Sequence, residues 1–403
     1  MISYEEALNF VLDSADQLDP INVPIEEALL YVLAKDVTSD RPLPPFNRVA
    51  MDGFAVNSSD FTAPEVRLKL VACIAAGDDY QKPLQSGEAI QIMTGAPCVE
   101  GADAVVMVEK SKKDGDFVVL TEESMAPGLN IAKKGEDAPL GKILIPAGTR
   151  LNTTGIAICA SVGLTSIPVY RKPVVNVIST GSEIIPPNQE PLPHQIRDCN
   201  SFSTRSLSKN LGIEANFLGI GEDNKETQSQ LIKSGLKGDI LILSGGVSMG
   251  EYDLIPSLLA ECGVKNIFHN IKVKPGKPVW FGKSESGTYV FGMPGNPVSV
   301  QAGFKLLIEP LILKLMGLKS PKPFFINFEL GHDIHIKNPR ENYIPAQLKT
   351  KDGKTVLQQV FIKGSGDFSN VISSHGLMRF PAGTGVVKAG SYIQFISWNR
   401  MND

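Results

Sequence analysis

The segment DILILSGGVSMGEYD, residues 239–253, indicates the fold of this 403-residue chain. It begins with a short run of Ile and Leu, which is typical of a fully buried strand, and a glycine-rich turn follows directly. Two further segments have the same order, VVNVISTGSE at 174–183 and YVFGMPGNPVS at 289–299. Glycine beside serine or threonine after a strand lets backbone N–H groups converge on an anion. Three such turns predict the carboxyl edge of a parallel sheet, where open α/β domains bind ligands.

The region from residue 172 to about 317 alternates buried strands with helical patterns. We expect strands at 174–179, 213–219, 239–243, 265–273 and 289–292, and helices at about 201–211, 224–234, 253–262 and 297–316. Strands separated by helices predict right-handed βαβ units and therefore a mainly parallel sheet.

The regions on either side of 172–317 have different sequence patterns. Helices are expected at 1–19 and 24–33, whereas 46–139 and 324–399 read as short strands between Gly, Pro and Asp turns. The predicted fold class is a multidomain α/β and β protein: a central, mainly parallel α/β sandwich domain, two smaller β-rich domains and a helical or mixed N-terminal segment. The expected boundaries are 1–43 plus 140–171 for a discontinuous N-terminal or linker domain, 44–139 for an inserted β-rich domain, 172–319 for the α/β domain and 320–403 for a C-terminal domain resembling a β-barrel.

Composition narrows the partners and the compartment. With a net charge of −4, no global field draws the chain to nucleic acid or to acidic lipid. The longest apolar stretch, residues 306–318, is too short to span a bilayer, and the acidic, amphipathic N-terminus does not resemble a secretory signal. The five cysteines are widely spaced and form no CxxC pair. We therefore expect a cytoplasmic protein without nucleic-acid or membrane partners.

The first glycine turn has hydroxyl and N–H groups that suit a phosphate, from Ser179, Thr180, Gly181 and Ser182. Glu183 follows and has two readings, a ligand for a metal or hydroxyl, or a solvated residue beside a capped turn. In the second turn, Gly245 and Gly246 permit close backbone approach to a phosphate, with Ser248 beside them. Glu251 and Asp253 come next, either as acids favoured by a helix dipole or as Mg²⁺ ligands, and the adjoining anion-type turn favours the metal.

Asp223 follows the expected strand at 213–219, so it too belongs to the carboxyl edge. Glu226 lies three residues further on, which is the spacing of a capping box. For an isolated Asp, a helix cap is the better reading, yet a site role at the edge stays open.

Five lysines and no acid lie between Glu261 and Glu285, at Lys265, Lys272, Lys274, Lys277 and Lys283. Alternation predicts that Lys272 and Lys274 share one face of a strand, and the following Pro-Gly turn presents Lys277. Such a run is usually a solvated edge, but beside three anion-type turns it favours a polyanionic ligand.

The third turn contains Pro294, Gly295, Asn296 and Pro297. Pro297 suits the first position of a helix, with Asn296 as its cap, so the loop is expected to form a rigid wall. Asp52 and Thr94 each lie in a separate glycine turn, and neither is informative alone.

Six motifs together carry a resemblance to a known family: PPFNRVAMDGFAV (44–56), IMTGAP (92–97), STGSE (179–183), SGGVSMGEYD (244–253), KPGKPVWFG (274–282) and GMPGNPVS (292–299). The chain resembles, over its whole length and in the same order, the molybdopterin molybdenumtransferase family, MoeA, which also occurs as the E domain of gephyrin. The resemblance implies a four-part protomer and an elongated homodimer with a shared active site. Other proteins of molybdenum cofactor biosynthesis are candidate partners.

The implied reaction is insertion of molybdate into adenylyl-molybdopterin, with Mg²⁺-dependent loss of AMP. The resemblance, position by position, implies catalytic roles for Asp52, Thr94, Asp223, Lys274 and Lys277. Together with the turns, it assigns Mg²⁺ to Glu183, Glu251 and Asp253. Substrate binding is assigned to Ser179, Thr180, Gly181, Ser182, Gly245, Gly246, Ser248, Lys272, Pro294, Gly295, Asn296, Pro297, Arg340 and Ser365, of which the last-named two have the loosest match. In the family, the second domain of one protomer faces the α/β domain of its partner, so Asp52 and Thr94 are expected to act in trans.

Two alternatives stay in view. An adenylyltransferase of the same pathway resembles only the region 172–317, so the β domains and the MDGFAV segment speak against it. A non-catalytic scaffold like gephyrin is the other alternative, although nothing here resembles the additional domain or linker of gephyrin.

Overall fold

The computed structural model describes residues 1–246 and 254–400. The chain forms two compact units, one of Met1–Lys35, Ala147–Ile156 and Ser166–Asp403, the other of Asp36–Pro146 and Ala157–Thr165. The expected four-part division stays a prediction. Every helix in the described part of the chain is too short or too polar to cross a membrane.

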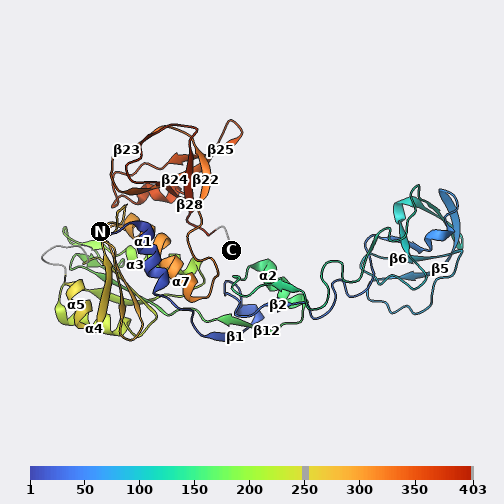
Figure 1. Cartoon of the computed structure of the whole chain (residues 1–403), viewed down its shortest axis with the longest axis horizontal. Coiled ribbons are helices and arrows are strands. Elements are labelled where there is room, and N and C mark those ends of the chain that lie inside the picture. Colours follow the sequence, from blue (N-terminus) through green and yellow to red (C-terminus); the bar gives the residue numbers. More distant parts are fainter. Residues whose placement is uncertain (247–253, 401–403) are drawn as a thin grey trace. The chain divides into compact units, whose positions relative to one another are not determined.

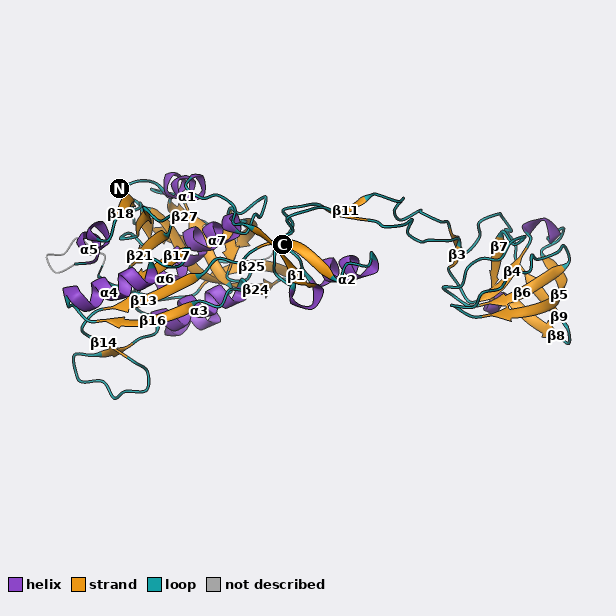
Figure 2. Cartoon of the chain, turned by 90° about the horizontal axis from the view of Figure 1, so that it is seen from below, coloured by secondary structure: helices purple, strands orange, loops and turns teal. Residues whose placement is uncertain are grey.

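The first unit is built on a six-stranded sheet with the order β16-β13-β17-β21-β20-β18 (Figure 2). Its strands are β13 (Val175–Thr180), β16 (Asn216–Gly221), β17 (Ile240–Ser244), β18 (Val264–His269), β20 (Trp280–Ser284) and β21 (Tyr289–Met293). The first four in the order are parallel, and β20 and β18 continue the sheet antiparallel. The prediction of a mainly parallel α/β domain is thus confirmed.

Helices cover both faces of this sheet (Figure 1). They are α1 (Tyr4–Asp13), α3 (Asn200–Asn210), α4 (Lys225–Gly235), α5 (Ile255–Glu261), α6 (Pro297–Gly303), the π-helical η4 (Phe304–Ile308) and α7 (Glu309–Leu315). Successive side chains of β17 point to opposite faces. Ile240 and Ile242 pack with α1, η4 and α7, whereas Leu241 and Leu243 pack with α4 and α5. The strand therefore needs apolar residues at every position, which explains its continuous apolar run.

Some expected elements are wrong. β1 (Pro20–Pro24) pairs with β12 (Ser166–Tyr170), and the helix expected at 24–33 is reduced to the short 3₁₀ turn η1 (Ile25–Glu27). Leu30 has φ +67°, and Val32 and Leu33 bridge to Arg150 and Val169, so long-range pairing overrides the local helical pattern of IEEALL. The strand expected at 265–273 ends at His269, where Asn270 has φ +70°, and β20 is a strand that we did not predict.

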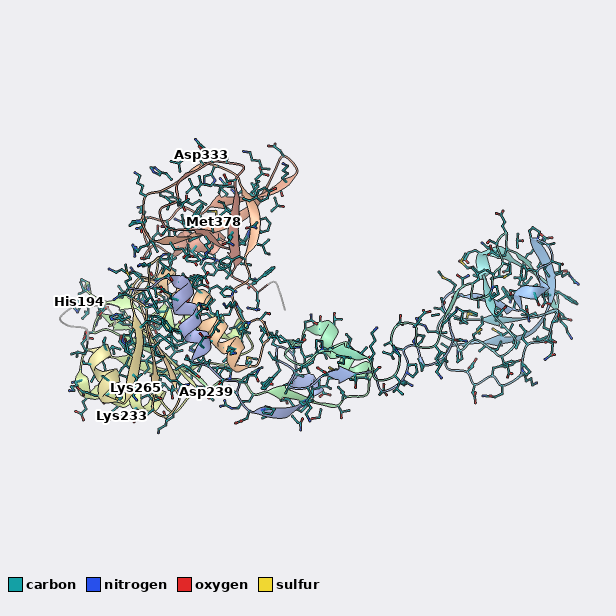
Figure 3. All side chains as sticks on the ribbon, viewed as in Figure 1. His194, Lys233, Asp239, Lys265, Asp333 and Met378 are labelled. Atoms are coloured by element: carbon teal, nitrogen blue, oxygen red, sulfur yellow. The ribbon has the colours of Figure 1, made fainter. Side chains whose placement is uncertain are left out.

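A closed β-barrel forms the C-terminal part of the same unit. Its ring consists of β24 (Glu341–Lys351), β25 (Lys354–Gln359), β22 (Ile326–Leu330), β28 (Tyr392–Ser397) and β26 (Gly376–Phe380), and β26 pairs back with β24. Met378, labelled in Figure 3, is fully buried in its core with Leu357 and Phe395. The short β23 (Ile334–Ile336) pairs with β27 (Gly385–Val387).

One short strand joins the α/β region to the barrel. β19 (Val273–Lys274) precedes β20 in the sequence, yet it pairs parallel with β24 at Glu341 and Asn342. This pairing brings the lysine-rich turn against the barrel.

The second unit contains another six-stranded sheet, with the order β7-β4-β6-β5-β9-β8. Its strands are β4 (Gly53–Val56), β5 (Glu65–Ile74), β6 (Glu88–Ile92), β7 (Ala104–Met107), β8 (Ser111–Asp114) and β9 (Phe117–Thr121). The same unit also contains two short strand pairs, which are β2 (Val37–Thr38) with β11 (Ile143–Ile145) and β3 (Arg48–Val49) with β10 (Ile131–Ala132). The remaining elements of the chain include α2 (Thr153–Ser161), β14 (Ile184–Ile185) and β15 (Ile196–Arg197).

Candidate functional site

The three glycine turns lie side by side at the carboxyl edge of the parallel strands. β13, β17 and β21 are neighbours in register, with Ser179 beside Ser244 and Ser244 beside Met293. The backbone N–H of Gly245 donates to the Met293 carbonyl at 3.0 Å. Gly245 has φ +96°, and a Cβ there would lie 2.4 Å from the Thr180 carbonyl oxygen. Only glycine fits this position, because both the backbone angle and the space exclude a side chain.

Asp223 joins the first turn to the end of β16. Its Oδ2 accepts a hydrogen bond from the Ser182 N–H at 3.2 Å, and its own N–H donates to Ser182 Oγ at 3.1 Å. The capping reading of Asp223 is wrong, since Asn224 is the N-cap of α4 and accepts from Glu226 and Thr227. A better cap one residue later leaves the Asp223 carboxylate at the edge of the sheet.

The polar residues of the first turn divide by exposure. Ser179 and Thr180 are buried, and the Thr180 hydroxyl donates to the Ser244 carbonyl at 3.2 Å. The Ser179 hydroxyl has no partner within the described part of the chain. Gly181, with φ +135°, has the Glu183 carboxylate directly against it. Gly181 is buried as well, so Ser182 and Glu183 are the exposed residues of this turn.

The third turn connects the sheet edge to the barrel. Asn296 occupies the N-cap position of α6 and Pro297 begins the helix, as expected, but the Asn296 side chain makes no capping bond. Its Nδ2 instead donates to Ser365 Oγ at 2.9 Å. The Val298 N–H donates to the Ser365 carbonyl at 3.2 Å. On the other side of the loop, Asn200 donates to the Gly295 carbonyl at 2.7 Å.

A cavity of about 530 Å³ lies beside this loop, between the α/β region and the barrel. Its basic lining residues are Lys274, Lys277, His335, Lys337, Arg340 and Lys363. Pro294, Asn296, Ser299 and Ser365 are also among its walls, and no Asp or Glu of the described residues lines it. Such a chamber favours a multiply charged anion.

Arg340 is held at two points in this cavity. Its Nη1 donates to the Val273 carbonyl at 3.0 Å, and its Nε donates to Asn338 Oδ1 at 3.2 Å. The structure therefore brings Arg340 and Ser365 together with Lys274 and Lys277, although about 60 to 90 residues separate the two pairs.

The lysine run is divided by the fold. Lys274 and Lys277 line the cavity, whereas Lys272 does not. Lys272 and Lys274 are both exposed on either side of the buried Val273, which agrees with the expected alternation, but only Lys274 reaches the cavity lining. Lys265 is exposed on β18 (Figure 3), and Lys283 donates to the Ser14 carbonyl and to the Tyr289 hydroxyl.

Sequence reasoning missed several polar residues of the cavity, among them His335, Lys337, Asn338 and Lys363. All four come from the barrel. The only available signal was the basic character of HIKNPR at 335–340, and its meaning depends on the pairing of β19 with β24.

In the second unit, Asp52 and Thr94 are hydrogen-bonded to each other. Asp52 Oδ1 accepts from the Thr94 hydroxyl at 2.6 Å and from the Thr94 N–H at 2.7 Å. These two bonds, the hydroxyl bond first, lower the pKa of the Asp52 carboxyl. Gly53 is in register with Ile92, so the β4–β6 pairing brings the two turns together. Ser248, Glu251 and Asp253 lie outside the described residues.

Comparison with known proteins identifies the family. Residues 2–163 match the MoeA N-terminal region (domain I and II), residues 176–314 the probable molybdopterin binding domain, and residues 327–398 the MoeA C-terminal region (domain IV). The chain is 33% identical over 402 residues to the molybdopterin molybdenumtransferase of Staphylococcus epidermidis, covering 98% of this chain and 95% of that protein. It is 30% identical to the protein of that name from Bacillus subtilis, covering 98% and 94%.

A solved structure agrees with this assignment. The crystal structure of a molybdopterin biosynthesis MoeA protein from Pyrococcus horikoshii OT3 has a TM-score of 0.82 at 30% identity, covering 98% of this chain and 100% of that one. Together these similarities extend over all the regions that carry the six motifs. The chain therefore belongs to the MoeA family of molybdopterin molybdenumtransferases.

Proposed function

We propose that this protein inserts molybdate into adenylyl-molybdopterin, releasing AMP and Mo-molybdopterin as a step of molybdenum cofactor biosynthesis. The observation that carries the proposal is the cavity between the α/β region and the barrel, in which six basic residues meet and no carboxylate of the described residues intrudes. Molybdate is a dianion, and Lys274, Lys277 and Arg340 supply the positive charge that would hold it.

The neighbouring glycine edge suits the other substrate. Adenylyl-molybdopterin carries a phosphoanhydride, and backbone N–H groups at glycine turns bind phosphate without adding bulk. The Pro294–Pro297 loop borders both the edge and the cavity, since Gly245 bonds to Met293 and Asn296 bonds to Ser365. The loop would therefore hold the two substrates next to each other.

The carboxylates at this edge fit a Mg²⁺ requirement. Glu183 lies against Gly181 and Asp223 bonds Ser182, so two hard oxygen donors flank the turn. The described residues contain no cluster of three or more metal-ligating side chains. Mg²⁺ commonly takes one or two carboxylates together with substrate phosphates and water. When bound, the ion would neutralise charge on the phosphoryl oxygens as AMP leaves.

Asp52 and Thr94 complete the proposal as a shared site in a cytoplasmic homodimer. The two hydrogen bonds from Thr94 lower the pKa of the Asp52 carboxyl and favour its ionised form, so the carboxylate is charged near neutral pH and can orient a ligand. We propose that this pair acts on the substrate held by the partner protomer.

The direct test is metal insertion. Purified protein receives adenylyl-molybdopterin, molybdate and Mg²⁺, and AMP release is followed with time. We expect release to require both molybdate and Mg²⁺. Release of AMP without molybdate contradicts insertion as the step, and absence of binding to molybdopterin or its AMP derivative favours the scaffold alternative.

Subunit mixing tests the shared site. Chains with Asp52→Ala and chains with Lys277→Ala are each expected to be inactive, whereas their heterodimer keeps one intact site. If heterodimers isolated with two affinity tags remain as inactive as the parents, the trans arrangement is wrong.

A further inference from the structure

We infer that two asparagines, Asn338 and Asn296, are positioning residues that aim the Arg340 guanidinium and the Ser365 hydroxyl at an oxyanion in the cavity. The inference rests on the proposed function of the cavity as the molybdate site. Both asparagines line the cavity, and each bonds directly to one of the two donors.

Asn338 holds Arg340 through a single oxygen. Oδ1 accepts from the Arg340 backbone N–H at 2.9 Å and from its Nε at 3.2 Å. The Val273 carbonyl takes one hydrogen of Nη1 at 3.0 Å. Both hydrogens of Nη2 are without a partner among the described residues, so this end of the guanidinium is left for a ligand.

The chemistry of the amide matters here. An arginine is usually held by a carboxylate, which orients the guanidinium but also neutralises its charge. An amide oxygen accepts the same hydrogen bonds and carries no net charge. In a cavity without carboxylates in its described lining, Asn338 fixes the direction of Arg340 and leaves its full positive charge for an anion.

Asn296 positions the Ser365 hydroxyl. Its Nδ2 donates to Ser365 Oγ at 2.9 Å, so the hydroxyl oxygen acts as acceptor in that bond. The hydroxyl hydrogen is then free to turn toward another acceptor. The Val298 N–H holds the Ser365 carbonyl at 3.2 Å, which fixes the backbone of the same residue.

Arg340 and Ser365 are positioned in the same way. The donors come from the barrel, but Val273 and Val298 belong to the α/β region, and their main-chain groups set the position of each donor. The barrel donors thereby line the same cavity as Lys274 and Lys277.

A double-mutant cycle tests the inference with molybdate as the probe, measured by calorimetry on the full-length protein. Asn338→Ala is expected to weaken molybdate binding about tenfold in the native background and less than about twofold in an Arg340→Ala background. Asn296→Ala is expected to behave in the same way relative to Ser365→Ala. Asn327→Ala, an exposed asparagine on β22 that does not line the cavity, is the matched control and is expected to change nothing.

Asn338→Asp supplies a second readout that does not depend on the stability of the alanine variant. It retains an acceptor for both Arg340 bonds but adds a negative charge, so we expect a native melting temperature and molybdate binding weaker by about tenfold or more. Equal weakening in the native and Arg340→Ala backgrounds, or native affinity in Asn338→Asp, overturns the inference. Native protein that binds no molybdate, as distinct from these outcomes, overturns the proposed role of the cavity and the inference with it.

Discussion

The glycine edge and the basic cavity border the same loop, Met293 to Pro297, yet they consist of different chemical groups. The edge consists of backbone groups and carboxylates, held by Gly245, Asp223 and Glu183. The charged side chains that line the cavity are basic, and no carboxylate of the described residues lines it. Shape and charge therefore have separate sources in this site: the shape of the edge depends on backbone conformation, and the charge of the cavity depends on side chains.

We therefore expect substitutions in the two regions to have different effects. Substitutions at the edge should act first on folding or on metal dependence, whereas those in the cavity should act on anion affinity while the protein stays folded.

Charge reversal in the cavity is expected to have the largest effect. Lys277→Glu removes a cation and adds an anion, and each unit charge at ~5 Å is worth about 3 kcal/mol at an effective dielectric constant of 20. We expect molybdate affinity to fall by at least about a hundredfold, with an unchanged melting temperature. Lys265→Glu, an exposed lysine of the same sequence cluster outside the cavity, is the control. Similar losses in both variants would mean that overall charge, and not the cavity, governs binding.

At the edge, Gly245→Ala is expected to act on stability. Its φ of +96° and the contact of 2.4 Å with the Thr180 carbonyl together predict a loss of about 2–4 kcal/mol in the free energy of unfolding. Gly287→Ala has φ +97° with no atom within 4 Å, so it isolates the backbone strain of about 1 kcal/mol. Urea unfolding measures both. Equal losses would show that the edge tolerates a side chain there.

Asp223 separates the two properties within the edge itself. Asp223→Asn can still accept the Ser182 N–H bond but has no charge, so we expect native stability and a rate of AMP release lowered about tenfold at fixed Mg²⁺. Asp223→Ala should also lose about 1 kcal/mol of stability, because it loses the bond to Ser182. An Asn variant with the native rate would confine Asp223 to holding the turn.

The Asp52–Thr94 pair carries the smallest expected change. Thr94→Val removes the hydroxyl bond but keeps the backbone bond, so the pKa of Asp52 should rise part of the way toward its ordinary value. The acid limb of the pH–rate profile should then begin at a higher pH. Carboxyl ¹³C shifts of Asp52 against pH measure the change directly, and Thr94→Ser, which keeps a hydroxyl, should titrate like the native protein.

Stability should follow the same sign. Because folding lowers the pKa of Asp52, the ionised pair stabilises the fold above the ordinary pKa of the carboxyl. That contribution disappears as the pH falls through the lowered pKa. A native-like pKa in Thr94→Val would mean that the backbone bond alone sets the ionisation.

Local patterns predicted much of the fold and of the edge. The strand β17 and the turn at Gly245 could be predicted because burial on both faces requires apolar residues and a positive φ favours glycine. The link between Asp52 and Thr94 came from family resemblance, and the β4–β6 register explains it physically.

Long-range pairing explains most of what could not be predicted. The helix expected at 24–33 is wrong because Val32 and Leu33 bridge to Arg150 and Val169, which are far away in the sequence. The contributions of Asn338 and Lys363 to the cavity depend on how the barrel docks against β19, which no local pattern encodes.

The pairing of β19 with β24 also has a consequence for the order of events during synthesis. Val273 and Lys274 find their partners at Glu341 and Asn342, which leave the ribosome well after the sheet strands on either side of β19. The loop that carries Lys274 and Lys277 therefore lacks its template until the C-terminal strands have emerged. A nascent chain that has already folded its parallel sheet would still lack Arg340 and Ser365, so the cavity is complete only after the C-terminal strands have been synthesised.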